Sequence, residues 1–478
     1  MAKVSTVKII EQCLVCPQPS SSSSSPPITS LPLTFLDIPW LFFPPSQPLF
    51  FYEFPYPTSH FTSVLLPNLK HSLSLSLQRF RPLAGTLILP PRPRKPEISC
   101  GEADSISFAV AESDGDFNHL SSPSCQRDAK EFHKLVPKLL PLLLSRDDDA
   151  RDKHPLLAIQ VTMFPNFGFT IGLAFHHAVA DGRTFNNFMR VWSTLCSDLI
   201  GRGSDHHIDR WSCYDRTVIV DSHGLEGIFL KEWWKRRCNL LPMVSAKLEL
   251  CDMVRATFVM GLDDMERVKG WIVTIQCKRK SKPHSLDFSP YVLTCAFLWV
   301  CLVKTQEIGG LTNGHSLNED LNYFGFIAGG LTRVGYPVPV TYFGNCIGFG
   351  RAMAVRGELI GEDGILVAAR AIRGAIKMLD KAMFSRADKW VTEWQTLIGS
   401  DIHIIVSGSP KLDLYEKDFG WGRPKKIEEI EIDTTKAISL SESRNVKGGM
   451  EIGMVLPKPQ MEAFAIIFKE GLKGSLVS

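Results

Sequence analysis

The chain has 478 residues, of which 44% are hydrophobic and 22% charged, proportions that exclude a disordered or fibrous protein and predict two or three globular domains. Its formal net charge of +3 is too small for a nucleic-acid or membrane-surface binder. Met1 to Cys16 lacks the pattern of a signal peptide, and no apolar stretch reads as a membrane span. We therefore expect a soluble protein of the cytosol.

The 12 cysteines are scattered, and several, such as Cys295 and Cys301, lie in apolar surroundings. Such cysteines are typical of buried free thiols in cytosolic proteins. Cys13 and Cys16 have the CxxC spacing of redox and zinc sites, but no second pair completes a zinc site. The sequence predicts neither a metal site nor a redox cofactor.

The spacing of apolar residues predicts the regular elements. Asn68 to Phe80 has leucines that alternate as in a strand and leucines that share a helical face; because no Gly or Pro interrupts it, we favour a helix. Thr184 to Leu199 is the clearest helix, with a single apolar stripe. The other expected segments are a low-complexity loop at Ser20 to Ser25, a strand or turn at Leu31 to Asp37, strands at Gln160 to Phe175 and Met253 to Met260, a polar interdomain connection at Gly201 to Arg216, a buried helix at Pro290 to Lys304 and a loop at Gly309 to Glu319.

His177 has an aspartate, Asp181, four positions further on, followed by Gly182. The motif lies between the predicted strand and the clearest helix, at an edge where side chains can reach a cleft. The spacing alone has a simpler interpretation, in which His177 is a core histidine and Asp181 begins the helix.

Two further loops combine glycine with aromatic residues. Asp418-Phe419-Gly420-Trp421-Gly422 predicts a tight turn that presents an aromatic side chain, with a mainly structural role for Asp418. Tyr342-Phe343-Gly344-Asn345-Cys346 predicts a loop that runs into a buried strand. Neither string identifies a reaction by its residue types.

Together, the His177-x-x-x-Asp181-Gly182 and Asp418-to-Gly422 strings resemble the two signature motifs of the BAHD acyltransferases. Tyr342 to Cys346 resembles a further motif of the anthocyanin and phenolic-glucoside branch of that family. The resemblance extends over essentially the whole chain, because supporting stretches occur in the family's order: Leu31 to Trp40, Arg81 to Gly85, Val254 to Phe258, Gly408 to Pro410 and Ser441 to Arg444.

The resemblance implies a mixed α/β fold of the chloramphenicol-acetyltransferase type, in two domains at residues 1–200 and 226–478 joined by a crossover at 201–225. It implies a monomer with a channel between the domains, where acyl-CoA and the acceptor enter from opposite faces and meet at His177. Asp181 would anchor its loop through an arginine, and Asp418 and Trp421 would support the channel, although Asp418 is often grouped with the histidine as functional. No metal or redox cofactor is implied.

The residues suit this chemistry. An alcohol is a poor nucleophile, so an imidazole such as that of His177 must take its proton as the oxygen attacks the thioester. The branch motif favours transfer of malonyl from malonyl-CoA to a sugar hydroxyl of a phenolic or flavonoid glucoside. Arg183 is the expected partner of the malonyl carboxylate, unless it is only a surface arginine at a helix start. The alternatives are a hydroxycinnamoyl-CoA donor, or a family member that has lost catalysis and acts as a binding protein.

Two stretches depart from the family. Leu331, within Ala328 to Arg333, stands where the family has an arginine that pairs with the residue matching Asp181, so we expect Arg333 or Arg183 to replace that partner. The other departure is Pro290, in the segment from Ser289 to Thr294. This segment and Lys269 resemble the CoA-contacting region, whereas a solvated helix face is the alternative for Lys269. Lys278 to Lys282 is a basic loop that could attract CoA phosphates, although a solvated loop is the simpler interpretation.

Overall fold

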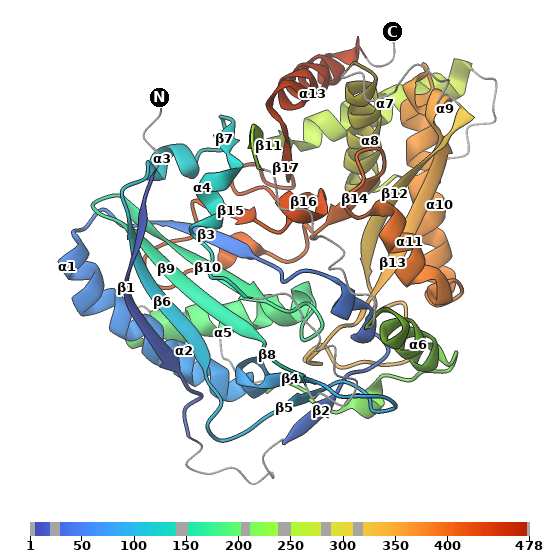
Figure 1. Cartoon of the computed structure of the whole chain (residues 1–478). Helices are drawn as coiled ribbons and strands as arrows, with labels where there is room; N and C mark the ends of the chain where they lie inside the picture. Colours follow the sequence, from blue (N-terminus) through green and yellow to red (C-terminus); the bar gives the residue numbers. More distant parts are fainter. Residues whose placement is uncertain are drawn as a thin grey trace.

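The computed structural model describes residues 5–19, 29–139, 152–201, 211–237, 250–278, 288–308 and 319–475. In these residues three β-sheets and their covering helices form the mixed α/β architecture that the sequence predicts (Figure 1). The expected loop at Ser20 to Ser25 lies outside these ranges, as do most of the loops at Lys278 to Lys282 and Gly309 to Glu319 and most of the expected connection at Gly201 to Arg216.

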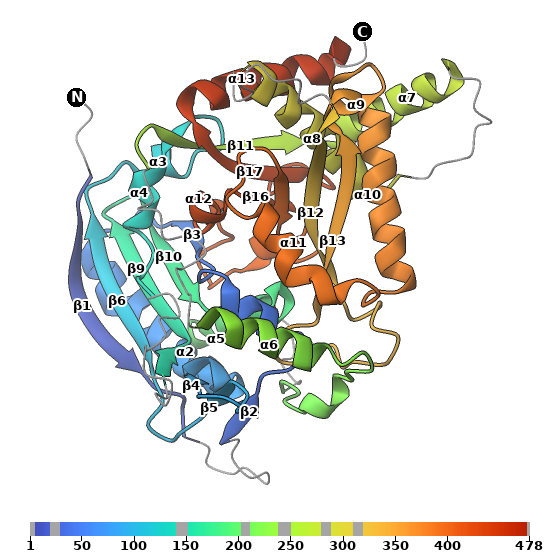
Figure 2. The same ribbon diagram turned by 45° about the vertical axis from the view of Figure 1, so that its right-hand side comes forward.

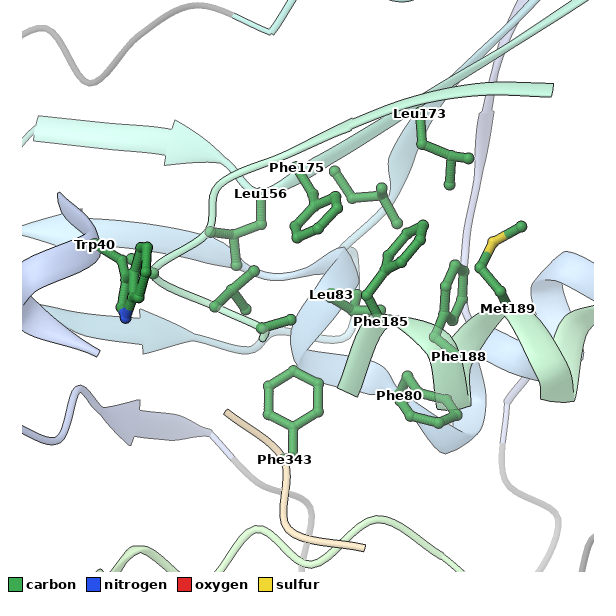
Figure 3. Close-up of a cluster of buried hydrophobic side chains, with 14 of the residues drawn as sticks. Trp40, Phe80, Leu83, Leu156, Leu173, Phe175, Phe185, Phe188, Met189 and Phe343 are labelled. Carbon is green, nitrogen blue, oxygen red and sulfur yellow. The ribbon is translucent and has the colours of Figure 1, made fainter. Parts of the chain in front are cut away.

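The first sheet has six strands in the order β1-β6-β9-β10-β3-β15. Helices α2 and α5 pack together against it, as Figure 1 shows. Their apolar side chains fill the core with those of β10, where the ring of Phe185 stacks on that of Phe175 at 4.7 Å (Figure 3). The elements are β1 (Val7–Val15), β3 (Pro48–Glu53), β6 (Ile106–Ser113), β9 (Leu157–Phe164), β10 (Gly168–Phe175), β15 (Lys426–Glu429), α2 (Leu66–Arg79) and α5 (Gly182–Leu199).

The second sheet has seven strands in the order β13-β12-β14-β16-β17-β11-β7. Its core lies under α7, α8, α10 and α13, and α10 runs beside β12 and β13 in Figure 2. The elements are β7 (Arg127–Asp128), β11 (Met253–Met260), β12 (Leu321–Gly329), β13 (Ile347–Val355), β14 (Ile404–Ser407), β16 (Ile438–Glu442), β17 (Met450–Pro457), α7 (Leu262–Lys278), α8 (Pro290–Ile308), α10 (Gly364–Lys381) and α13 (Lys458–Glu470).

Most of the remaining elements are short. The third sheet, in the order β2-β5-β4-β8, consists of β2 (Ser30–Pro32), β4 (Thr86–Leu89), β5 (Glu97–Ser99) and β8 (Asp152–Pro155). The other helices are α1 (Thr58–His60), α3 (Phe117–Leu120), α4 (Ala129–His133), α6 (Leu225–Arg237), α9 (Arg356–Ile360), α11 (Trp390–Leu397) and α12 (Ile432–Thr435). Tight 3-10 or π turns are η1 (Ile38–Phe42), η2 (Phe61–Leu65), η3 (Arg81–Ala84), η4 (Arg216–Val218), η6 (Ala387–Lys389), η7 (Leu414–Glu416) and η8 (Gly471–Ser475).

The predicted helices and strands named above are confirmed at α2, β9–β10, α5, β11 and α8. The prediction for Gln160 to Phe175 becomes a hairpin, because Phe164 and Gly168 pair across the turn. One expectation is corrected: α8 is long and apolar enough by composition to span a membrane. However, 72% of its most apolar window is buried inside the protein, since α7, α10 and α13 pack around it.

The two halves of the chain exchange strands. β15, from the C-terminal half, pairs with β3 and completes the first sheet, whereas β7, from the N-terminal half, pairs with β11 in the second. The expected domains at 1–200 and 226–478 therefore each contribute a short strand to the other's sheet. The division itself stays a prediction.

Candidate active site

His177 lies in the turn between β10 and α5. The pairing of β10 ends at Phe175, whose backbone exchanges two hydrogen bonds with Ser46. The amide of Val179 then donates to the carbonyl of His176 and that of Ala180 to the carbonyl of His177, which turns the chain into the helix. The side chain of His176 is buried, whereas that of His177 lines a cavity.

The imidazole of His177 is held neutral. It stacks on the indole of Trp40 with ring centroids 3.9 Å apart and 20° between the planes. Burial lowers the pKa of His177 to about 4, although Asp181 and Asp37 act in the opposite direction. Its Nδ1 is buried without a hydrogen-bond partner among the described residues. A neutral imidazole at the wall of a cavity can accept a proton at physiological pH.

Asp181 fastens the start of α5 to the loop that follows β12. Its Oδ1 accepts a hydrogen bond from the amide of Thr184 at 2.8 Å, as an N-cap does, and its Oδ2 accepts from the amide of Cys346 at 3.0 Å. The guanidinium of Arg183 lies 3.7 Å away. The expectation that Arg183 takes the place of the missing family arginine as the partner of Asp181 is thus confirmed. Arg333 instead pairs with Asp380 at 2.7 Å.

Asp37 is a positioning residue that the sequence did not single out. It is fully buried, and its Oδ1 accepts from both the amide and the Nδ2 of Asn345, each at 2.9 Å. Asn345 Nδ2 also donates to the carbonyl of His177 at 3.0 Å. Asp37 Oδ2 accepts from the amide and hydroxyl of Thr34. The Tyr342-to-Cys346 motif therefore supports the histidine loop from behind.

Arg216 closes this arrangement on the other side. Its Nη1 donates to the hydroxyl of Tyr342 and to the carbonyl of Phe343, both at 2.8 Å, and lies 3.7 Å from Asp37. A Cβ at Gly344 would come within 2.4 Å of this nitrogen, and the φ of +129° also favours glycine there. The glycine of the motif is thus required by the packing of an arginine from the crossover region.

The cavity beside His177 has a volume of about 320 Å³. One wall is aromatic: the rings of Trp40 and Phe43 lie 6.0 and 5.1 Å from that of Trp394. Residues of both large sheets meet there, including Phe175 from the first and Ile405 from the second. Such a cavity suits an aromatic ligand brought up to a proton acceptor.

Arg183 lines the cavity but also holds the motif loop. Its Nη1 donates to the carbonyl of Val340 at 2.6 Å and its Nη2 to that of Tyr342 at 2.9 Å. The side chain is about one-fifth exposed. The interpretation of Arg183 as a surface arginine alone is therefore wrong, and its expected role toward a carboxylate stays a prediction.

Asp418 and Trp421 lie at the opposite end of α5. The side chain of Asp418 is exposed. It accepts hydrogen bonds from the amides of Gly420 and Gly422 at 2.6 and 2.9 Å. Gly420 packs against Ile200, the residue just beyond α5. Since a helix rises about 1.5 Å per residue, this loop lies about 27 Å along the helix from Asp181. Neither Asp418 nor Trp421 is among the described residues that line the cavity. This corrects the grouping of Asp418 with the catalytic histidine: it stabilises a turn.

The expected CoA contacts are also outside the described cavity lining. Lys269 projects from α7 with its Nζ 3.4 Å from Glu266, a partly exposed ion pair typical of a solvated helix face. Ser289 is exposed at the start of α8 and accepts from the amide of Val292 at 3.4 Å. Their roles toward CoA stay predictions. The next residue but one, Tyr291, does line the cavity.

Residues 5–470 of the chain match the model of the Transferase family. The chain belongs to this family, that of the BAHD acyltransferases. It is 36% identical to the coumaroyl-CoA:anthocyanidin 3-O-glucoside-6''-O-coumaroyltransferase 1 of Arabidopsis thaliana, over 99% of each chain. It is 35% identical to the malonyl-coenzyme A:anthocyanin 3-O-glucoside-6''-O-malonyltransferase of Dahlia pinnata, over 100% of each chain.

The fold is also found in the crystal structure of vinorine synthase, with a TM-score of 0.66, 16% identity and 96% of each chain covered. The family and the fold predicted from the sequence motifs are thus confirmed. As a BAHD acyltransferase, the protein takes an acyl group from acyl-CoA, its co-substrate.

Proposed function

We propose that this BAHD acyltransferase transfers malonyl from malonyl-CoA to a sugar hydroxyl of a phenolic or flavonoid glucoside. The observation that carries the proposal is the neutral imidazole of His177 at the wall of an aromatic cavity. His177 takes the hydroxyl proton as the oxygen attacks the thioester carbon, and then returns a proton to the departing CoA sulfur. Trp40 and Trp394 offer flat apolar faces for a phenolic ring.

Both relatives named above act on anthocyanin or anthocyanidin glucosides, but one uses malonyl and the other coumaroyl. Arg183 supports malonyl, because it is a cation on the cavity wall and guanidinium pairs well with carboxylate. Coumaroyl transfer is the second candidate, supported by the aromatic wall. The third reading, a binding protein without catalysis, rested on an unpartnered Asp181, whereas two amides and Arg183 contact this carboxylate.

The test is product detection by mass spectrometry with a kaempferol glucoside and malonyl-CoA, acetyl-CoA or coumaroyl-CoA. We expect one added malonyl group with the wild type and none with His177→Ala. No product from a folded wild type with any donor would sink the proposal. A measurement of the purified protein's mass in solution checks the prediction of a monomer. Imaging of a tagged chain in plant cells checks the prediction that the protein lies in the cytosol.

The donor itself is tested by Arg183→Ala, scored as the ratio of kcat/KM for malonyl-CoA to that for coumaroyl-CoA. Because Arg183 also holds Val340 and Tyr342, a purely structural role would lower both values alike. We expect the ratio to fall by about tenfold or more, the effect of one charge-assisted hydrogen-bonded pair. An unchanged ratio would refute its role toward malonyl.

A further inference from the structure

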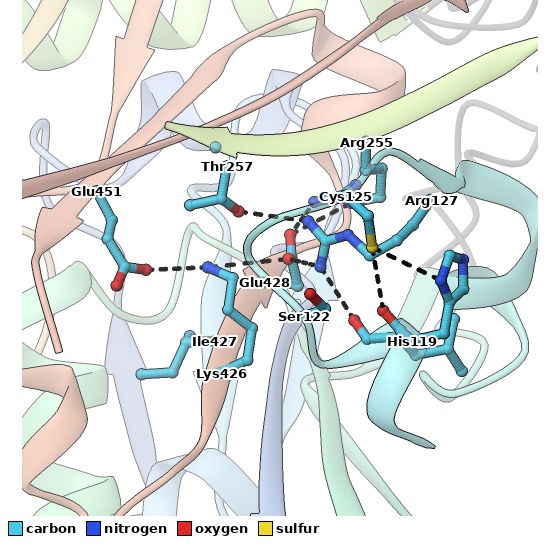
Figure 4. A network of polar contacts seen from close by, with 12 residues as sticks. His119, Ser122, Cys125, Arg127, Arg255, Thr257, Lys426, Ile427, Glu428 and Glu451 are labelled. Atoms are coloured by element: carbon cyan, nitrogen blue, oxygen red, sulfur yellow. Dashed lines mark hydrogen bonds and ion pairs between the residues drawn. The ribbon is translucent and has the colours of Figure 1, made fainter. Parts of the chain in front are cut away.

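β15 presents different chemistry on its two faces. Side chains alternate along a strand, so Lys426 and Glu428 point one way while Ile427 and Glu429 point the other. Lys426 and Glu428 enter a buried ionic network between the two large sheets, shown in Figure 4. Ile427 and Glu429 line the cavity beside His177, and Glu431, just after the strand, lines it as well.

The ionic network uses the cations that lie near these glutamates. Glu428 pairs with Arg127 at 2.6 Å and with Arg255 at 3.1 Å. Although burial alone would raise it, Arg127, Lys426 and Arg255 hold the pKa of Glu428 at about 2. Arg255 also pairs with Asp433 and donates to the backbone carbonyl of Glu429 at 2.6 Å. Glu428 is therefore a structural carboxylate whose charge is fully compensated.

Glu429 and Glu431 differ from Glu428 in their interaction partners. Within the described parts of the chain, no lysine or arginine forms an ion pair with either carboxylate, and Glu431 accepts a hydrogen bond from the amide of Gln47 at 3.0 Å. Burial raises the pKa of both groups, and the carboxyl of Glu431 also raises the pKa of Glu429, whereas Arg255 acts in the opposite direction on both. Two adjoining carboxyl groups without an ion-pair partner of their own are costly inside a protein unless something binds them.

The sheet register places this pair near the reaction centre. Glu429 is paired with Pro48 on β3, and Phe175 is bridged to Ser46, two residues earlier on that same chain segment. Neighbouring strands lie about 4.8 Å apart, so Glu429 and Phe175, which flank this segment, are separated by about 10 to 12 Å. His177 follows Phe175 by two residues. A ligand in the cavity can therefore contact the carboxyl pair and His177 at once.

We propose that Glu429 and Glu431 bind the sugar of the acceptor, by accepting hydrogen bonds from its hydroxyl groups; this rests on the proposed function. Carboxylate oxygens are strong acceptors for hydroxyl donors, and two adjoining carboxyls can engage neighbouring hydroxyls of one ring. The pair does not suit the donor, because malonyl and the phosphates of CoA are anions that adjoining carboxylates repel. The pair thus selects a glucoside over its aglycone.

The test compares binding of a kaempferol glucoside and of kaempferol by titration calorimetry, without any donor, for the wild type, Glu429→Ala and Glu431→Ala. We expect the Kd for the glucoside to rise roughly tenfold to hundredfold in each variant, the effect of losing hydrogen bonds to a charged group. The Kd for kaempferol should change less than about twofold. Glu53→Gln is the matched control, because Glu53 is exposed on β3 and pairs with Lys425; it should leave both Kd values unchanged.

Glu429→Gln separates binding from packing. Because the amide has nearly the same shape and keeps one acceptor oxygen, Glu429→Gln should lose less glucoside affinity than Glu429→Ala and stay within about fivefold of the wild type. The inference is overturned if the alanine variants, folded by circular dichroism, weaken both ligands equally or neither. It is also overturned if the wild type binds an alkylamine such as agmatine and not the glucoside. Glucoside binding that depends on the pair, without acyl transfer, would leave the inference intact and reject only the proposed function.

Discussion

The two signature loops sit at opposite ends of α5, and each contains an aspartate that accepts hydrogen bonds from two backbone amides. Asp181, 1% exposed, joins the start of the helix to Cys346, a residue 165 positions away in the chain. Asp418 is exposed, and among the described residues the hydrogen bonds that it accepts come from amides of its own loop. The same residue type thus supports the reaction centre at one end and a local turn at the other.

The Asp418 loop has its own structural task. Phe419 is fully buried, with its ring 5.0 Å from that of Trp192 on α5 and 5.7 Å from that of Tyr52 on β3. A Cβ at Gly420, where φ is +99°, would come within 2.1 Å of Ile200. The loop therefore holds the end of α5 against the first sheet. A motif can mark a family without touching its reacting atoms.

Of the substitutions in the two loops and their supports, removal of the Asp181 side chain is expected to have the largest combined effect on stability and activity. Asp181→Ala leaves the amides of Thr184 and Cys346 without their acceptor and frees the turn that carries His177. We expect stability to fall by about 2 to 4 kcal/mol, the sum of a lost N-cap and an unsatisfied buried amide. Activity should fall by about a hundredfold. Urea unfolding and steady-state kinetics measure both. Asp181→Asn, which keeps one acceptor oxygen, should lose clearly less, and equal losses would contradict the role assigned to these bonds.

A smaller effect is expected behind the histidine. Asn345→Ala removes the hydrogen bonds from the side-chain amide to Asp37 and to the carbonyl of His177, but keeps the backbone bond to Asp37. We expect kcat to fall about tenfold with little change in the KM for either substrate, because the loop is displaced while the cavity remains. A rise in KM at unchanged kcat would instead place Asn345 in substrate binding.

The subtlest expected effect is on the pH profile. Burial lowers the pKa of His177 to about 4, below its ordinary value of 6.5, so the base stays neutral through this window. The acid limb of kcat/KM should therefore lie near pH 4 to 5 and not near 6.5. The unfolded chain binds more protons than the folded one in the same window, so stability also falls on acidification through it. Circular dichroism at each pH distinguishes protonation of His177 from unfolding of the protein. An acid limb of kcat/KM near pH 6.5 in folded protein would contradict the lowered pKa of His177.

The sequence predicted the parts of the site that are local. The hairpin β9–β10 and the amphipathic α5 follow from apolar periodicity, and the turn between them carries His177 and Asp181. The support for this turn was not predictable in the same way. Asp37 and Asn345 are 308 positions apart, and nothing in either segment indicates the other. The one sequence feature that could have drawn attention to this support is Asp37 itself, a charged residue at the end of the apolar run that begins at Leu31.

The strand β15 was missed for a related reason. It has four residues, three of them charged, and it pairs with a strand nearly 380 positions earlier. Its sequence, Lys426-Ile427-Glu428-Glu429, is typical of a surface segment. Its position at the edge of the first sheet instead buries one face of the strand and turns the other toward the cavity. Burial set by such distant pairing cannot be read from a local pattern.

The most direct test of the contrast between the two loops is a side-by-side assay of His177→Ala and Asp418→Ala. His177→Ala should lower kcat/KM by about a thousandfold, the usual contribution of a general base, and leave the unfolding midpoint nearly unchanged. Asp418→Ala should lower kcat/KM less than about fivefold when assayed well below its own unfolding midpoint. Similar losses of activity in two well-folded variants would contradict the account and return Asp418 to the reaction centre.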